Sequence, residues 1–195
     1  MKNTAASLLD LPAMLAANPR IGVLIVLLVA AAVIDYRSYR IPNWLTVGGM
    51  LLGLACSAIL PSPDHTGLVW ALGGLAVGFG VMLPLYALRI LGAGDVKLMA
   101  MAGAFLGAFG TLYAILFTFI AGGVLAIALA LTHGALLRML GNVKNVVQFM
   151  TFSIMGGVRP AAPIEAGASI GRLPYGISIT AGTIAYLAVS GLGSA

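Results

Sequence analysis

Long apolar stretches follow one another along the chain and are separated by short polar segments. A transmembrane helix needs roughly 20 mostly apolar residues, and only helices or closed barrels satisfy their backbone groups in lipid. The pattern therefore predicts an all-α, polytopic membrane protein, a bundle of about six transmembrane helices. The expected spans cover residues 20–34, 44–60, 68–90, 96–109, 111–137 and 173–192.

The same pattern divides the chain into a short tail and one membrane-embedded domain. Residues 1–19 contain charges and prolines before the first long apolar stretch, and they predict an exposed N-terminal tail. Residues 20–195 are expected to form the membrane domain. Its longest segment between spans is 138–172, in which 142–154 is compatible with an amphipathic helix at the membrane surface.

Composition strengthens the membrane assignment. The chain is 61% hydrophobic and only 8% charged, with a mean hydropathy of +1.09. Soluble domains carry about 25% charged residues, so a surface this poor in charge needs the lipid bilayer as its solvent. The basic residues are scattered singly, and the net charge of +5 therefore does not predict nucleic-acid binding.

The positions of the basic residues predict an orientation. Eight of the ten fall in or beside the segments that join spans 1 and 2, 3 and 4, and 5 and 6, whereas Lys2 and Arg20 lie on the opposite side. Cytoplasmic loops carry an excess of Lys and Arg. We therefore expect these three segments to be cytoplasmic and both termini to be outside.

Two of the five acidic residues lie where an apolar span meets a loop. Asp35 follows the first span and Asp95 precedes the fourth, both on the expected cytoplasmic side, whereas the other three acids lie in segments expected to be solvated. An ionisable group at membrane depth is costly and suggests a function. Two carboxyl groups at close range share one proton, and they can then activate a water for attack on a peptide carbonyl.

Helix dipoles suggest how the two acids would divide this work. Asp95 is expected at the positive N-terminus of the fourth span, where an anion is favoured, and Asp35 at the negative C-terminus of the first. The hypothesis is that Asp95 is the resting base and Asp35 the proton carrier. Neighbouring basic residues oppose this assignment for Asp35.

Each of these residues also has a structural interpretation. After the turn that Gly92 and Gly94 permit, Asp95 could simply cap the fourth span. Arg37 and Arg40 could be ordinary cytoplasmic anchors. Pro42 and Asn43 could simply start the second span.

Two other function classes stay open. A small proton- or cation-coupled transporter could use the same aspartates, although transport sites lie near the bilayer midplane and these acids lie at loop junctions. In a structural assembly protein they would be caps alone. Peptide hydrolysis by two acids needs no metal or cofactor, and Cys56, His65 and His133 show no metal-ligand spacing, so neither is expected.

Three segments in order resemble the type IV prepilin peptidase family, one of the GxGD aspartic peptidases. Asp35-Tyr-Arg-Ser-Tyr-Arg-Ile-Pro-Asn43 resembles the first active-site motif of that family. Gly92-Ala-Gly-Asp95-Val-Lys97-Leu resembles the second, and Leu173-Pro-Tyr-Gly176 resembles the Pro-Tyr-Gly that opens its last span. The resemblance covers about residues 20 to 192.

The resemblance implies a hydrolase, a prepilin peptidase of the inner membrane whose catalytic pair is Asp35 and Asp95. Its substrates would be prepilin-like proteins for pilus assembly, cut at the cytoplasmic face between a short basic leader and an apolar helix. Gly92 and Gly94 would support Asp95, and Lys97 would lie beside the site. Further substrate-binding or supporting candidates are Arg37, Arg40, Pro42 and Asn43.

The resemblance also implies a branch of the family. Larger members carry paired Cys-x-x-Cys motifs in a cytoplasmic domain and methylate the new N-terminus, whereas this chain has one cysteine, so no methyltransferase activity is expected. The small size resembles the Flp/Tad-type peptidases, and the archaeal preflagellin peptidases are a similar alternative. The sequence indicates no oligomeric state.

Overall fold

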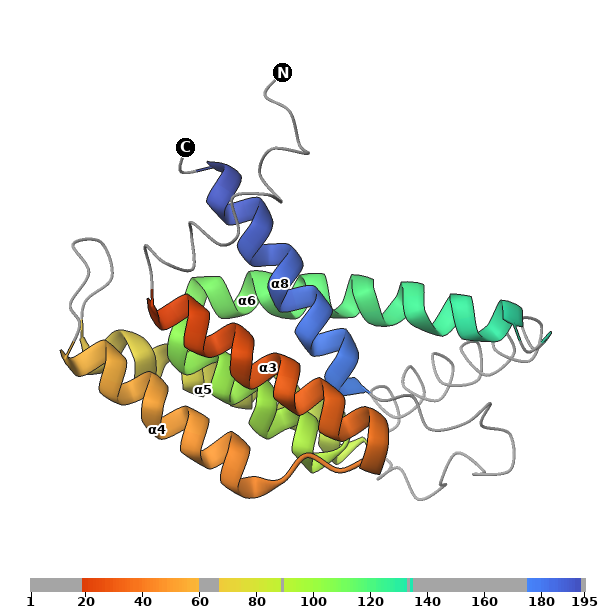
Figure 1. The fold of residues 1–195 in the computed structure, drawn as a ribbon, viewed down its shortest axis with the longest axis horizontal. Helices are drawn as coiled ribbons and strands as arrows, with labels where there is room; N and C mark the ends of the chain where they lie inside the picture. The colour runs from red at the N-terminus through yellow and green to blue at the C-terminus, as the bar shows by residue number, and fades with distance from the viewer. Residues whose placement is uncertain (1–18, 60–66, 89, 133, 135–174, 194–195) are drawn as a thin grey trace, which may run out of the picture. The chain divides into compact units, whose positions relative to one another are not determined.

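The computed structural model describes residues 19–59, 67–88, 90–132, 134 and 175–193. Within these ranges the chain forms five α-helices and no strand, which confirms the expected all-α fold (Figure 1). The expected N-terminal tail and the segment 138–172 lie outside the described residues, so the predicted division into tail and membrane domain stays a prediction.

The helices follow the predicted apolar spans. They are α3 (Pro19–Ser38), α4 (Asn43–Ile59), α5 (Leu68–Ala87), α6 (Ala93–Thr132) and α8 (Tyr175–Gly193). Three of them, α3, α5 and α6, are long and apolar enough to cross a membrane, and α4 is a shorter apolar helix. The chain is therefore an integral membrane protein, and the number of crossings stays a prediction.

A break at Gly107 divides α6 into the two helical parts that were expected as the fourth and fifth spans. Gly107 has φ 69° and ψ 176°, a backbone conformation that glycine adopts readily and other residues rarely do. A Cβ atom at this position would also overlap the indole ring of Trp70. The predicted end of the fourth span, residue 109, was therefore two residues late.

The part of α6 before this break forms the centre of the bundle. Every residue from 98 to 105 is buried. Glycines on the neighbouring helices permit close approach: a Cβ at Gly53 of α4 would lie 2.9 Å from the Phe105 ring, and one at Gly78 of α5 would lie 2.6 Å from the Met99 carbonyl oxygen. The start of this central helix carries Asp95.

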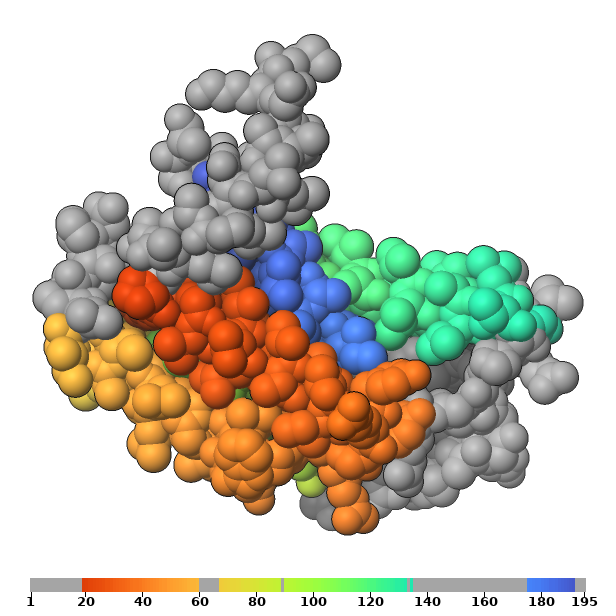
Figure 2. Space-filling view, in the orientation of Figure 1, coloured from red at the N-terminus to blue at the C-terminus, as the bar shows by residue number. Residues whose placement is uncertain are grey.

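Helix α3 packs against both α4 and α8, and Figure 2 shows α3 (red to orange) lying against α8 (blue). The Thr180 hydroxyl of α8 donates a hydrogen bond of 2.9 Å to the Leu28 carbonyl of α3. About two turns further along α3, the Asp35 side chain accepts a hydrogen bond from Gly176 at the start of α8. The two helices therefore run antiparallel.

The chain divides into two compact units, Met1–Gly122 with Pro174–Ala195, and Gly123–Leu173. In the second unit the described residues are the last turns of α6, to Thr132, and Gly134, which has φ 60°. All candidate site residues described below belong to the first unit.

Candidate active site

Asp35 lies in the last turns of α3 and not in a loop, because α3 continues through the polar residues as far as Ser38. Its side chain is buried, with 6% of its surface exposed. Its Oδ2 atom accepts a hydrogen bond of 2.8 Å from the backbone N–H of Gly176, a residue 141 positions away in sequence. Asp35 was expected where a helix meets a loop. In the structure it lies near the end of a helix, and the start of α8 contacts it there.

Asp95 is the third residue of α6 and is 9% exposed. Its Oδ2 accepts a hydrogen bond of 3.0 Å from the Gly92 N–H, and its own N–H donates to the Gly92 carbonyl at 3.1 Å. A carboxylate that reaches back from the third helical position to the residue before the helix is half of a capping box. Asp95 therefore does cap α6, as the structural interpretation expected.

In Asp95 and in Asp35, the backbone hydrogen bond involves only one of the two carboxyl oxygens. Only Oδ2 of Asp95 is held by the Gly92 N–H, and only Oδ2 of Asp35 is held by the Gly176 N–H. Among the described residues, neither Oδ1 atom has a hydrogen-bond partner. Each carboxyl group is thus held through one oxygen by a backbone N–H of a described residue.

The structure brings the two carboxyl groups within electrostatic range of each other. They come from the end of α3 and the start of α6, which meet at one end of the bundle. The dipole argument for their separate roles loses its basis here, because Asp35 also lies at a helix N-terminus, that of α8. Which acid carries the proton at rest does not follow from the helix ends.

The turn between α3 and α4 closes over the start of α6. Tyr39 has φ 50°, and its N–H donates a 2.8 Å hydrogen bond to the Asp35 carbonyl, so it ends α3 in the left-handed conformation. The chain then places Ile41 against Gly94, where a Cβ atom would lie 3.2 Å from the Cβ of Ile41. A side chain at 94 would therefore require Ile41 to shift by a few tenths of an ångström.

Asn43 is the first residue of α4 and Pro42 directly precedes it, so the two stand at the start of the helix, as the structural interpretation expected. The Pro42 carbonyl accepts the Leu45 N–H at 3.2 Å. The Asn43 side chain also has a role between helices, because its Oδ1 accepts a 2.9 Å hydrogen bond from Nζ of Lys97 in α6. This pair fastens the start of α4 to the start of α6 beside Asp95.

The two arginines after Asp35 face outward. Arg37 and Arg40 are both exposed. Neither side chain forms an ion pair or a hydrogen bond with another residue in the described ranges. Lys97 differs from both, because its ammonium group is hydrogen-bonded to Asn43.

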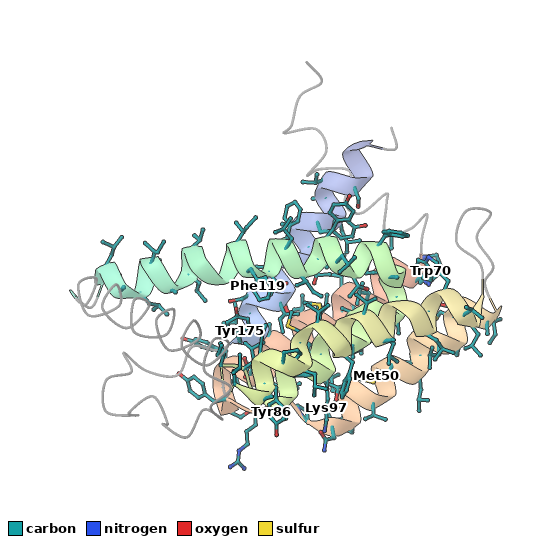
Figure 3. The ribbon with its side chains drawn as sticks, turned by 180° about the vertical axis from the view of Figure 1, so that it is seen from behind. Met50, Trp70, Tyr86, Lys97, Phe119 and Tyr175 are labelled. Atoms are coloured by element: carbon teal, nitrogen blue, oxygen red, sulfur yellow. The ribbon has the colours of Figure 1, made fainter. Side chains whose placement is uncertain are left out.

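Sequence reasoning missed Gly176 and Tyr175 as site residues, although the Pro-Tyr-Gly segment was noticed. Gly176 holds Asp35, and the half-buried Tyr175 interacts electrostatically with Asp95. Figure 3 shows Tyr175 and Lys97 toward one end of the bundle and Trp70 toward the other. The available signal was a tyrosine and a glycine directly at the start of an apolar span.

The described part of the chain contains no cluster of side chains that could hold a metal ion. No group of three or more His, Cys, Asp or Glu side chains comes together there, and Cys56 is a free, half-buried thiol in α4. What the arrangement offers chemically is two buried carboxyl groups, each held by a backbone N–H, at one end of a helical bundle.

Comparison with known proteins gives two matches. The type IV leader peptidase family matches residues 22–127, a range that contains Asp35 and Asp95 but not Gly176. The prepilin leader peptidase/N-methyltransferase of Myxococcus xanthus (strain DK1622) is 38% identical over 119 residues. This match covers 57% of the chain but only 35%, about a third, of the relative's length. No solved structure matches the chain.

Proposed function

The chain belongs to the type IV leader peptidase family, and on this premise we propose that it is an aspartic endopeptidase that removes the leader from prepilin-like substrates. One observation carries the aspartic mechanism. Asp35 and Asp95, buried acids from distant helices, interact electrostatically, and each keeps one oxygen unbound by the described residues. The pairing is the chemistry that peptide hydrolysis by acids needs.

The reaction uses one ionised and one protonated carboxyl group. The carboxylate accepts a proton from a water as the water oxygen attacks the peptide carbonyl carbon, while the protonated acid donates a hydrogen bond to the carbonyl oxygen. The carbon–nitrogen bond then breaks, and a proton moves to the leaving nitrogen. The new carboxylic acid of the leader then gives up its proton and the new amino group of the mature protein takes one up, so the products are a carboxylate and an ammonium group, and the pair again holds one proton.

The glycine loop before α6 gives a substrate backbone access to this pair. Gly92 and Ala93 are exposed, whereas Asp95 directly after them is buried. An extended peptide lying along the loop would meet no side chain at Gly92. We propose that the scissile bond lies there, with the apolar helix of the substrate in the lipid beside the bundle.

The location of the site follows the charge pattern. The end of the bundle that holds Asp35 and Asp95 also holds Arg37, Arg40 and Lys97. By the positive-inside rule we propose that this end faces the cytoplasm in a bacterial inner membrane, with both chain termini on the opposite side.

Arg37 and Arg40 have the exposure that binding a substrate carboxylate requires. Both are exposed and unpaired with any described residue. Lys97, which was expected to lie beside the site, has its ammonium group held by Asn43. We assign the two arginines to substrate binding, and Lys97 with Asn43 to support of the site.

The transporter alternative gains no support from the family match, and no observation at the site favours it. Both acids lie at helix ends, not along the middle of a span. Transport sites, in contrast, lie near the bilayer midplane.

Co-expression with a Flp-type prepilin tests the proposed function. Asp35→Asn and Asp95→Asn are each expected to leave the prepilin unprocessed on a gel, at wild-type levels of membrane-inserted enzyme. Asp64→Asn is the matched acid-to-amide control and is expected to process normally. Processing by either site variant at the wild-type rate would exclude this acid pair as the catalytic groups.

A further inference from the structure

The N-terminus of α8 contacts Asp35 more closely than ordinary helix packing requires. Gly176 is the second residue of α8, and N–H groups in the first turn have no acceptor within their own helix. The Asp35 carboxyl group supplies that acceptor, with 2.8 Å between the Gly176 nitrogen and Oδ2. The contact is buried and joins two residues that are 141 positions apart in the sequence.

Close approach makes position 176 sensitive to any added side chain. A Cβ atom there would lie 2.8 Å from Oδ2, 3.1 Å from Cβ and 3.2 Å from Cγ of Asp35. Backbone conformation is not the reason, because Gly176 is not among the residues with positive φ. Any side chain at 176 would therefore have to push the carboxyl group or the start of α8 aside.

A second contact fixes the position of α8 along α3. Thr180 lies about one turn after Gly176 and Leu28 about two turns before Asp35. The buried Thr180 hydroxyl donates to the Leu28 carbonyl at 2.9 Å. The hydrogen bonds of Gly176 and Thr180 lie at different positions along α3. A shift or rotation of α8 on α3 would therefore break at least one of them.

We propose that the start of α8 is a positioning element of the active site, with Gly176 and Thr180 as positioning residues that act through Asp35. The Gly176 N–H fixes Oδ2 of Asp35 and thereby presents Oδ1 for the reaction, as the Gly92 N–H does for Asp95. Each acid is thus oriented by the N–H of a glycine, one before α6 and one in α8. This inference rests on the proposed peptidase function.

Steady-state kinetics of Gly176→Ala test the proposal. The purified full-length enzyme is assayed on a Flp-type prepilin in detergent. Displacing a reacting group by a fraction of an ångström to 1 Å costs up to about 100-fold in rate, so kcat is expected to fall roughly 10- to 100-fold while KM stays within about twofold. Gly80→Ala, at an exposed position with open space around its Cβ, is the control and should match wild type.

Thr180→Val provides the second arm, which also decides the matter if Gly176→Ala does not fold. Valine keeps the shape of threonine but removes the hydrogen bond to Leu28, so kcat should fall about 3- to 10-fold with KM unchanged. Thr180→Ser restores the hydroxyl and should recover the wild-type kcat. A merely structural role would lower the amount of folded enzyme without this split between kcat and KM.

The outcomes separate this inference from the function on which it rests. Wild-type kcat in Gly176→Ala, or in Thr180→Val where the alanine variant does not fold, overturns the positioning role while the peptidase stands. Processing by Asp35→Asn at the wild-type rate overturns the function itself. A fall in kcat for both α8 variants, with loss of processing in Asp35→Asn, supports both.

Discussion

Replacing Asp95 with Asn separates its capping contact from its acid–base chemistry. The side-chain carbonyl of Asn can accept the Gly92 N–H where Oδ2 of Asp95 now does, at 3.0 Å. The amide can neither take a proton from the attacking water nor give one to the substrate. The cap should therefore survive the substitution, and the proposed reaction should not.

The expected magnitudes of the two effects differ widely. Removing a negative charge from a helix N-terminus costs about 0.3–1 kcal/mol. Because Asp95 is only 9% exposed, a neutral amide also avoids the cost of burying a charge, and this offsets part of that loss. We expect the free energy of unfolding to change by about 1 kcal/mol or less, whereas loss of a general acid or base lowers the rate by about 10²–10⁴-fold.

The assay compares Asp95→Asn with Asp95→Ala on both properties. Thermal unfolding of the purified enzyme is followed by circular dichroism, and prepilin processing by gel shift. The Ala variant also loses the cap, so it should be less stable than the Asn variant by about 1 kcal/mol and equally inactive. An Asn variant that processes within about tenfold of the wild-type rate would show that Asp95 is a cap alone.

Other substitutions test the break in α6 and the basic residues. Gly107→Ala places a methyl group against the Trp70 indole at a positive φ and should cost at least about 1–3 kcal/mol of stability, measured by thermal unfolding; unchanged stability would contradict the break. Arg37→Gln with Arg40→Gln should raise the KM for prepilin by about tenfold at constant kcat, and an unchanged KM would remove them from substrate binding. Lys97→Met should cost about 1 kcal/mol of stability through the lost hydrogen bond to Asn43; equal stability would show that the bond does not fasten the helices.

Hydropathy predicted the helices well because lipid solvation depends on local composition. The expected second span, residues 44–60, begins one residue after the start of α4 (Asn43–Ile59), and residue 60 lies outside the described residues. The first span was ended too early, because charged and polar side chains lower the hydropathy without breaking a helix. Helix α3 therefore carries Asp35 in its last turns, where a loop junction was expected.

Contacts between distant segments could not be derived in the same way. The bond from Gly176 to Asp35 joins residues 141 positions apart and depends on how α8 packs on α3. The dipole argument considered only the helix that carries each acid, so it overlooked the second helix N-terminus at Asp35. The contact of Ile41 with Gly94 was likewise invisible, because no local pattern pairs the first motif with the second.

Cross-linking tests most directly whether the two acids meet at one site. With Cys56→Ala removing the chain's one natural cysteine, Asp35→Cys and Asp95→Cys are combined and treated in membranes with a short bifunctional thiol reagent. We predict an intramolecular cross-link, seen as a linked pair of peptides by mass spectrometry and absent from either single variant. If both cysteines react with a monofunctional reagent of similar size and yet no link forms, the two carboxyl groups do not share a site.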